Sequence, residues 1–196
     1  VGGQSGIDVE RDSPGTAGEA LDRAALGLPG RQAALVRRVA ATGTPVVAVL
    51  VSGRPLAVPD VVEQAAATVA AWLPGQSGGP AIADVLLGAD PGGRLPVSLP
   101  RSVGQLPVDY RRDAVSRGEY VFTEETPLFP FGHGESYAAF RYGELSVASD
   151  AVPTDGELTA TVTVENVAER AGTEVVQLYA GHGGGCNLRA VDEIGP

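Results

Sequence analysis

The sequence predicts an α/β fold with a mostly parallel sheet and flanking helices, followed by a region of antiparallel strands. The first part of this prediction comes from helical and strand-like segments that alternate over residues 1–100. Such alternation implies parallel strands with right-handed crossovers, and functional groups on the loops at their carboxyl ends. The second part comes from residues 158–164, where apolar and polar side chains alternate with the period of a half-buried strand.

The elements of the first hundred residues follow one another in a regular order of helix and strand. They are expected at residues 32–42, 46–51, 60–66, 68–73, 78–87 and 94–99. The first is an amphipathic helix, because Leu35, Val36 and Val39 fall on one face. The β-branched run at residues 46–51 is typical of a strand that is buried on both faces. Residues 1–3 are consistent with the end of a further strand.

Turn signals delimit the third helix closely. The Pro-Gly pair at residues 74–75 predicts a sharp turn before it. Within the helix, Ile82, Val85 and Leu86 have the spacing of one buried stripe. Gly88 is a typical C-terminal stop. The helix is therefore expected to pack on a core through a single apolar face.

The pattern changes after the first hundred residues. Residues 101–137 have mixed charge and little periodicity, which is typical of a linker that wraps over a surface. Residues 157–179 predict two strands that pair antiparallel across a turn at residues 166–172. No pattern assigns a structure to residues 181–196.

Three long motifs occur in sequence order. They are W-L-P-G-Q-S-G-G-P-A-I-A-D-V-L-L-G at residues 72–88, G-G-R-L-P-V-S-L-P at residues 92–100 and P-L-F-P-F-G-H-G-E-S-Y at residues 127–137. All three resemble the second domain of family-3 glycoside hydrolases, the β-glucosidase and β-xylosidase group. Residues 164–179 resemble the fibronectin type III-like third domain that many members have. The resemblance extends over about residues 15–180.

This resemblance implies three parts in the chain. They are the C-terminal α/β domain of the family at residues 1–100, a wrapping linker at residues 101–137 and an incomplete fibronectin III-like β-sandwich at residues 138–196. A complete sandwich of this type has about seven strands. The family's first domain is a TIM barrel, which takes about 250 residues. We therefore expect the chain to be a piece of a longer protein, with an N-terminal barrel as its partner.

A glycine-flanked acidic segment, G-T-A-G-E-A-L-D-R at residues 15–23, resembles the loop that carries the family's general acid/base. The resemblance assigns that role to Glu19, with Asp22 and Arg23 as support for the loop. A retaining glycosidase needs one carboxyl to protonate the leaving oxygen and a second, about 5–5.5 Å away, as nucleophile. In the family the nucleophile is an Asp of the barrel, so this chain is expected to be inactive by itself. The implied activity is hydrolysis of terminal β-linked sugars from glycosides or oligosaccharides, with no metal or organic cofactor.

The residues also leave other functions open. Ser77 lies in G-Q-S-G-G, the form of an α/β-hydrolase nucleophile elbow, with Asp109 or Asp113 and then His133 in the usual chain order. The motif is short, and a glycine-rich helix start explains it better. A second alternative is a non-catalytic module that holds carbohydrate or packs on a barrel. Trp72, at a strand end, is more often a core residue than a platform for a sugar.

Composition bounds the partners and cofactors. The 196 residues carry a net charge of −10, which disfavours binding to the phosphate backbone of nucleic acid. The longest apolar runs are too short to cross a membrane. Cys186 is the only cysteine, so no intrachain disulfide is possible. His182 and Cys186 supply two of the four ligands that a structural zinc site needs, so no metal site is expected.

Overall fold

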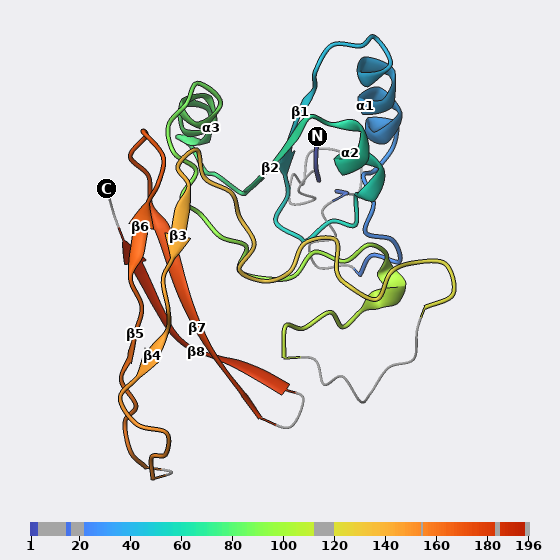
Figure 1. The fold of residues 1–196 in the computed structure, drawn as a ribbon. Coiled ribbons are helices and arrows are strands. Elements are labelled where there is room, and N and C mark those ends of the chain that lie inside the picture. Colours follow the sequence, from blue (N-terminus) through green and yellow to red (C-terminus); the bar gives the residue numbers. More distant parts are fainter. Residues whose placement is uncertain (4–14, 17–21, 112–119, 154, 183–184, 195–196) are drawn as a thin grey trace.

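The computed structural model consists of a small mixed α/β half and a β-rich half (Figure 1). It describes residues 1–3, 15–16, 22–111, 120–153, 155–182 and 185–194. The helices are α1 (Gln32–Ala40), α2 (Pro59–Gln64) and α3 (Gly78–Leu86), with a 3₁₀ turn at Val103–Gln105. The strands are β1 (Val47–Val51), β2 (Ala67–Trp72), β3 (Phe140–Tyr142), β4 (Ser146–Val147), β5 (Ala160–Thr161), β6 (Val164–Asn166), β7 (Glu174–His182) and β8 (Gly185–Ile194).

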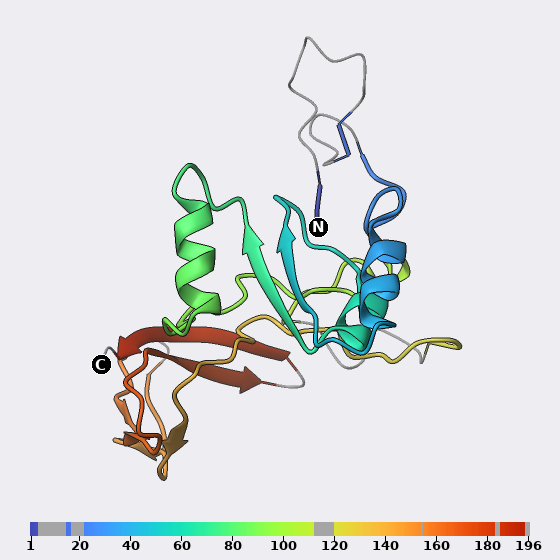
Figure 2. The same cartoon turned by 90° about the horizontal axis from the view of Figure 1, so that it is seen from above.

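The parallel pair predicted from the first hundred residues is confirmed. Strands β1 and β2 run parallel, and their register shifts by one residue at Leu50/Val51. Gly2 forms a parallel bridge with Val51, so residues 1–3 lie along β1 as the end of a strand would. Figures 1 and 2 show α1 and α2 on one side of the pair and α3 on the other.

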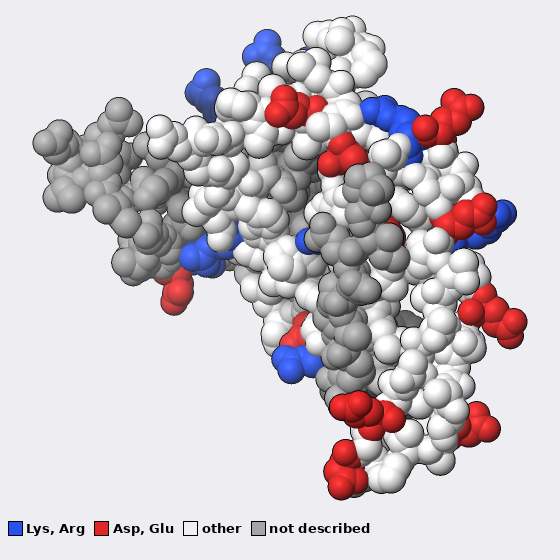
Figure 3. All heavy atoms as spheres, turned by 90° about the vertical axis from the view of Figure 1, so that its left-hand side faces the viewer, with Lys and Arg blue, Asp and Glu red and all other residues white. Residues whose placement is uncertain are grey.

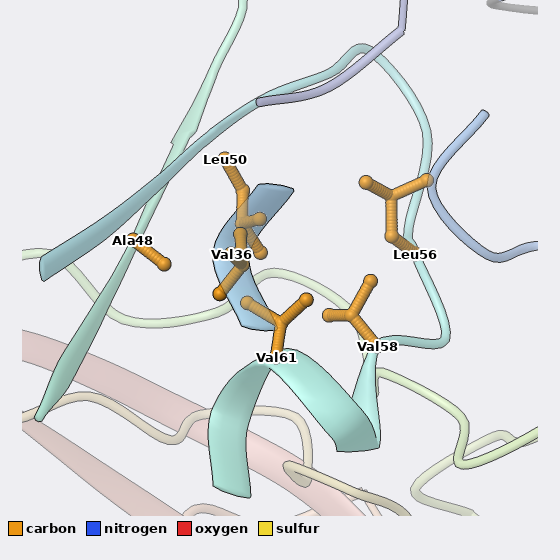
Figure 4. Close-up of a cluster of buried hydrophobic side chains, with 6 residues drawn as sticks. All are labelled: Val36, Ala48, Leu50, Leu56, Val58 and Val61. Carbon is orange, nitrogen blue, oxygen red and sulfur yellow. The ribbon is translucent and has the colours of Figure 1, made fainter. Parts of the chain in front are cut away.

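The main core lies between the parallel pair and the helices α1 and α2. Its fully buried members are Val36, Ala48, Leu50, Leu56, Val58 and Val61, which point toward one another in Figure 4. Alternate residues of β1 face this cluster, as a strand's period of two requires. Val47, on the opposite face of β1, is 47% exposed. The expectation that both faces of this strand are buried is therefore wrong for the described residues, because α1 and α2 cover one face.

Helix α3 has the predicted limits but not the predicted environment. It starts at Gly78, and Gly88 follows its end with a φ of 115°, a conformation that suits glycine. Leu86 is 45% exposed and Leu87 is 88% exposed. The expected buried stripe is therefore wrong for Leu86, while Ile82 and Val85 are half-buried.

A third strand at residues 94–99 was expected and is not formed. This segment is extended, but it makes one isolated bridge, between Leu99 and Phe129. Backbone bonds still link it to residues 128–133, including Leu95 N–H to the His133 carbonyl at 2.8 Å. Pro96 lacks the N–H that a continuous ladder would need, so the two segments touch at intervals.

A buried glutamine joins two parts of the segment after Pro100. Gln105 is 1% exposed. Its Nε2 donates to the carbonyls of Glu124 at 2.9 Å and Thr126 at 3.3 Å, and its Oε1 accepts from Arg101 N–H. These bonds satisfy the buried amide and link residues 101–105 to residues 124–126 of the same segment.

The β-rich half is built from three antiparallel pairs, and its pairing differs from the prediction. Strand β3 pairs with β6, β4 with β5, and β7 with β8. The predicted partnership of the two strands in residues 157–179 is therefore wrong. The tail that showed no pattern supplies β8, the partner of β7. In the sequence, the glycine-rich run H-G-G-G at residues 182–185 is typical of a hairpin turn.

Acidic side chains dominate the surface of the β-rich half. Figure 3 shows them spread over this part of the molecule. Between residues 140 and 182 the acidic residues are Glu144, Asp150, Asp155, Glu157, Glu165, Glu169 and Glu174, against Arg141 and Arg170. Among the described residues, no helix reaches the length and apolarity needed to cross a membrane.

Candidate active-site edge and interdomain contacts

Loops gather at the carboxyl edge of the parallel strands, where sites form in this class of sheet. They follow residues 1–3, β1 and β2. A cleft of about 500 Å³ opens there, and its described lining includes Gly2, Thr16, Gln32 and Val51. Thr16 belongs to the predicted acid/base loop. The described start of that loop therefore lies at this cleft.

The strand end that leads into the loop is firmly held. The side-chain amide of Gln32 bonds both backbone groups of Gly2, accepting from its N–H at 2.6 Å and donating to its carbonyl at 2.9 Å. Val51 N–H donates to the carbonyl of Val1 at 2.9 Å, and Gly3 N–H donates to the carbonyl of Val51 at 3.2 Å. The first residue of α1 thus fixes the point from which the loop departs.

The return of the loop is fixed as well. Leu26 is buried, and its carbonyl accepts from Ala57 N–H at 2.9 Å, in the loop after β1. Arg23 Nη2 donates to the carbonyl of Gly27 at 2.8 Å. Arg23 Nη1 is buried and has no hydrogen-bond partner among the described residues. Both ends of the loop are therefore anchored at one edge of the sheet.

Glu19 itself lies in residues 17–21, outside the described residues. Asp22 is exposed, and no ion pair joins it to Arg23 in the described part of the chain. The support of Arg23 for the loop runs through the backbone at Gly27. The roles of Glu19, Asp22 and Arg23 stay predictions.

The serine-hydrolase alternative gains no support from the described residues. Ser77 is exposed at the N-cap of α3 and has no hydrogen bond to His133. The His133 ring stacks on Phe129, with ring centroids 4.8 Å apart. Asp109 bonds Arg111 at 2.9 Å, and Asp113 lies outside the described residues. A nucleophile elbow needs its serine within hydrogen-bond reach of the histidine.

Trp72 ends β2 in an unusual conformation. Its φ is 53°, and the register shift of the parallel pair falls at this residue. The side chain lines a small cavity with Leu50, Leu56 and Leu99, so it lies on the side of the core. This position favours the structural role for Trp72 over stacking on a sugar.

Asp90 joins the two halves of the molecule. Its carboxylate accepts hydrogen bonds from the hydroxyl of Ser136, from Tyr137 N–H at 3.0 Å and from Thr173 N–H at 2.8 Å. Burial raises the pKa of Asp90, but the bonds from Ser136, Thr173 and Tyr137 lower it, and the net pKa lies below its ordinary value. Nearby, Arg170 Nη2 donates to the carbonyl of Gly88.

We expect Asp90→Asn to destabilise the chain by about 1–3 kcal/mol at pH 7, because an amide nitrogen in place of Oδ2 cannot accept the bond from Thr173 N–H. The lowered pKa means that the ionised form stabilises the fold above about pH 4, and that this contribution is lost as pH falls through the folded-state pKa. Urea unfolding at pH 7 and at about pH 3 measures both effects. Asp84→Asn, an exposed carboxylate on α3, is the control. Equal losses in the two variants at pH 7 would contradict the role of Asp90.

A second charged contact lies close by. Arg94 Nη2 pairs with Glu174 Oε2 at 2.5 Å, and the two side chains are 10% and 13% exposed. Tyr142 OH donates to Glu174 Oε1 at 2.7 Å. Burial, together with the bond to Glu174, raises the pKa of Tyr142 to about 12. Sequence reasoning missed Asp90, Arg94 and Glu174, since their partners lie up to 83 residues away and leave no local pattern.

No group of three or more potential metal ligands occurs within the described ranges.

Comparisons with known proteins place this fold and loop in the class of glycoside hydrolases. The family described as the glycosyl hydrolase family 3 C-terminal domain matches residues 6–137, most of the chain. The chain belongs to glycoside hydrolase family 3.

Individual relatives agree. A β-xylosidase of Formosa agariphila is 43% identical over 169 residues, which are 84% of this chain and 23% of the relative. A periplasmic β-glucosidase of Salmonella typhimurium is 40% identical over 185 residues, covering 88% of this chain and 24% of the relative. The chain thus spans about a quarter of the length of these relatives.

Solved structures share the fold. A β-glucosidase from Erythrobacter marinus superposes with a TM-score of 0.84 at 39% identity, over 89% of this chain and 24% of that protein. A β-glucosidase from Listeria innocua gives a TM-score of 0.81 at 32% identity, over 91% of this chain and 27% of that protein.

Proposed function

We propose that this chain is the part of a retaining β-glycosidase that carries the general acid/base, Glu19, and that an N-terminal barrel of the same protein carries the nucleophile. The observation that carries the proposal is the anchoring of the Glu19 loop. Thr16 lines the carboxyl-edge cleft, and the loop's return is tied to the turn after β1 through Leu26 and Ala57. A loop held at both ends on this edge is positioned to meet a partner domain.

The chemistry requires a second carboxylate that the described residues do not supply. A retaining mechanism places it about 5–5.5 Å from the acid/base. Neither Asp84 nor Asp90 is suited to be this second carboxylate. Asp84 is exposed on α3, and Asp90 already accepts three hydrogen bonds at the interdomain contact. Closure of a barrel over the loop would also desolvate Glu19 and hold its proton near neutral pH. No metal or organic cofactor enters this mechanism.

The proposed substrates are glycosides or oligosaccharides with a terminal β-linked sugar. Relatives bear the names β-xylosidase and β-glucosidase, which supports this substrate class. The acidic surface of the β-rich half supports a partner other than nucleic acid.

We further propose the division into an α/β domain at residues 1–100, a linker at residues 101–137 and an incomplete fibronectin III-like domain at residues 138–196. Three antiparallel strand pairs in the last part support it. A sandwich of this type has about seven strands in two sheets, so further strands would complete it in the parent protein.

Assays of the 196-residue chain alone test the division of labour. Aryl β-glucoside and aryl β-xyloside are expected to remain intact with this chain and to be hydrolysed by the full-length parent. Glycoside turnover by the chain alone would show that it holds both carboxylates. Aryl ester turnover that disappears in Ser77→Ala would instead establish the serine-hydrolase alternative.

A further inference from the structure

A second cleft lies between the two halves of the molecule, where residues 130–138 pass β7 (Figure 1). Its volume is about 520 Å³, within the range of small-molecule sites. It shares no described lining residue with the carboxyl-edge cleft. We call it the interdomain cleft, and its function does not follow from that of Glu19.

The charges of the interdomain cleft balance one another. Arg94 and Glu174 line it and are paired, and both side chains are largely buried. The Tyr142 hydroxyl donates a hydrogen bond to the same carboxylate. A cleft with internally paired charge gives an ionic ligand little net attraction, so a neutral polar ligand fits it best.

One wall of the cleft is aromatic. Phe131 and Tyr179 line it, and the ring of Tyr110 contacts both of them. The ring of Tyr110 stacks on Phe131 with centroids 4.6 Å apart and meets Tyr179 edge-on at 6.1 Å. These mutual contacts hold the rings in place. Aromatic rings offer an apolar face with a polar tip, which suits a ligand that has both C–H faces and hydroxyl groups.

His133 supplies unused hydrogen-bonding capacity beside this wall. Its ring lines the cleft and is held by stacking on Phe129 at 4.8 Å. Within the described part of the chain, neither ring nitrogen has a hydrogen-bond partner. A neutral imidazole has one donor and one acceptor, the complement of a hydroxyl group. Nearby, the side chain of Gln177 donates through Nε2 to the carbonyl of Gly132 at 3.2 Å, and its Oε1 accepts from the Tyr179 hydroxyl.

From these observations we propose that the interdomain cleft is a non-catalytic binding site for a neutral sugar ring. The ring packs a C–H face on Phe131 and Tyr179, and a hydroxyl group bonds the imidazole of His133. The site would hold one sugar unit of a glycan by ring packing and hydrogen bonding alone. Binding there involves no bond cleavage.

Titration of the 196-residue chain with cellotetraose and with xylotetraose, followed by ¹H–¹⁵N correlation spectra, tests the site. We expect saturable shifts at the backbone amides of residues 131–134 and 175–179. His133→Phe keeps the stack on Phe129 and removes both ring nitrogens. It should weaken binding by about two- to tenfold, the effect of one lost hydrogen bond. Glucuronic acid should bind more weakly than glucose.

Two control variants separate this site from others. Phe122 is fully exposed and does not line the cleft, so Phe122→Ala should leave binding unchanged. Glu19→Gln should also leave it unchanged, which separates this proposal from the proposed catalysis. Absence of saturable shifts, equal affinity in His133→Phe, or equal losses in Phe122→Ala and His133→Phe would each overturn the proposal. Circular dichroism and the unfolding midpoint confirm that each variant is folded.

Discussion

In the full-length parent of this chain, Glu19→Gln is expected to slow hydrolysis of glycosides with poor leaving groups by about 10²–10⁴-fold in kcat. A glutamine has no proton to give to the departing oxygen, and it cannot act as a base toward water in the second step. An activated aryl leaving group departs without protonation, so its first step should be affected far less. The measurement is kcat and KM over a series of aryl β-glycosides that differ in the pKa of the leaving group.

Glu10→Gln is the matched control, since it removes a carboxylate nearby in the chain but outside the motif at residues 15–23. It should leave the dependence on the leaving group unchanged. Equal rates for Glu19→Gln and the parent on the poorest leaving groups would refute the acid/base role. The membership in the family and the fold would stand in that case, because they rest on other residues.

The largest expected effect on stability comes from Glu174→Ala. This change leaves the largely buried Arg94 guanidinium without its carboxylate and removes the acceptor of the Tyr142 hydroxyl. Breaking a buried ion pair from one side costs about 3–5 kcal/mol, because the remaining charge stays desolvated. Urea unfolding of the 196-residue chain, followed at pH 7, measures this loss.

Arg141 and Glu165 form a comparable pair on the surface, with side chains 67% and 58% exposed. Glu165→Ala should therefore cost less than about 1 kcal/mol. Replacing Arg94 by Met in the Glu174→Ala variant should restore part of the loss, since no unpaired charge is then buried. A loss in Glu174→Ala no larger than that in Glu165→Ala would show that the pair does not stabilise the junction.

Local patterns in the sequence were sufficient for the elements of the α/β half. The spacing in residues 32–42, the β-branched run before Ser52 and the glycine at position 88 all act within a few residues of one another, and they correspond to α1, β1 and the end of α3. The resemblance to family 3 also rested on contiguous motifs, and the family comparison confirms it.

The incorrect predictions concern which segment each helix or strand packs against or pairs with. Residues 94–99 have the composition of a strand, yet their partner contains Pro127 and Pro130, and Pro96 interrupts their own donors. The strands in residues 157–179 show the correct alternation, but alternation does not say which strand is the neighbour. The exposed leucines of α3 fit a helical stripe equally well, whether or not another element covers them.

The candidate site was likewise predictable from the sequence only in part. Its sequence predicts Glu19 through a motif, while the tertiary structure identifies the anchors Gln32 and Ala57, which neither belong to the motif nor resemble functional residues. No local sequence pattern predicted the interdomain contacts of Asp90 and Glu174. Their meaning depends on burial and on partners brought close by the fold.

By itself, the sequence determined the family and the alternation of helices and strands, and it predicts Glu19 as the general acid/base. All of these depend on side chains that are close along the chain. Only the tertiary structure decided which strands pair, which apolar faces are covered and which carboxylates are already bound. Those outcomes depend on contacts between residues up to 83 positions apart. The free energy of burying a side chain is set by the residues that surround it in the folded protein, which local spacing does not reveal.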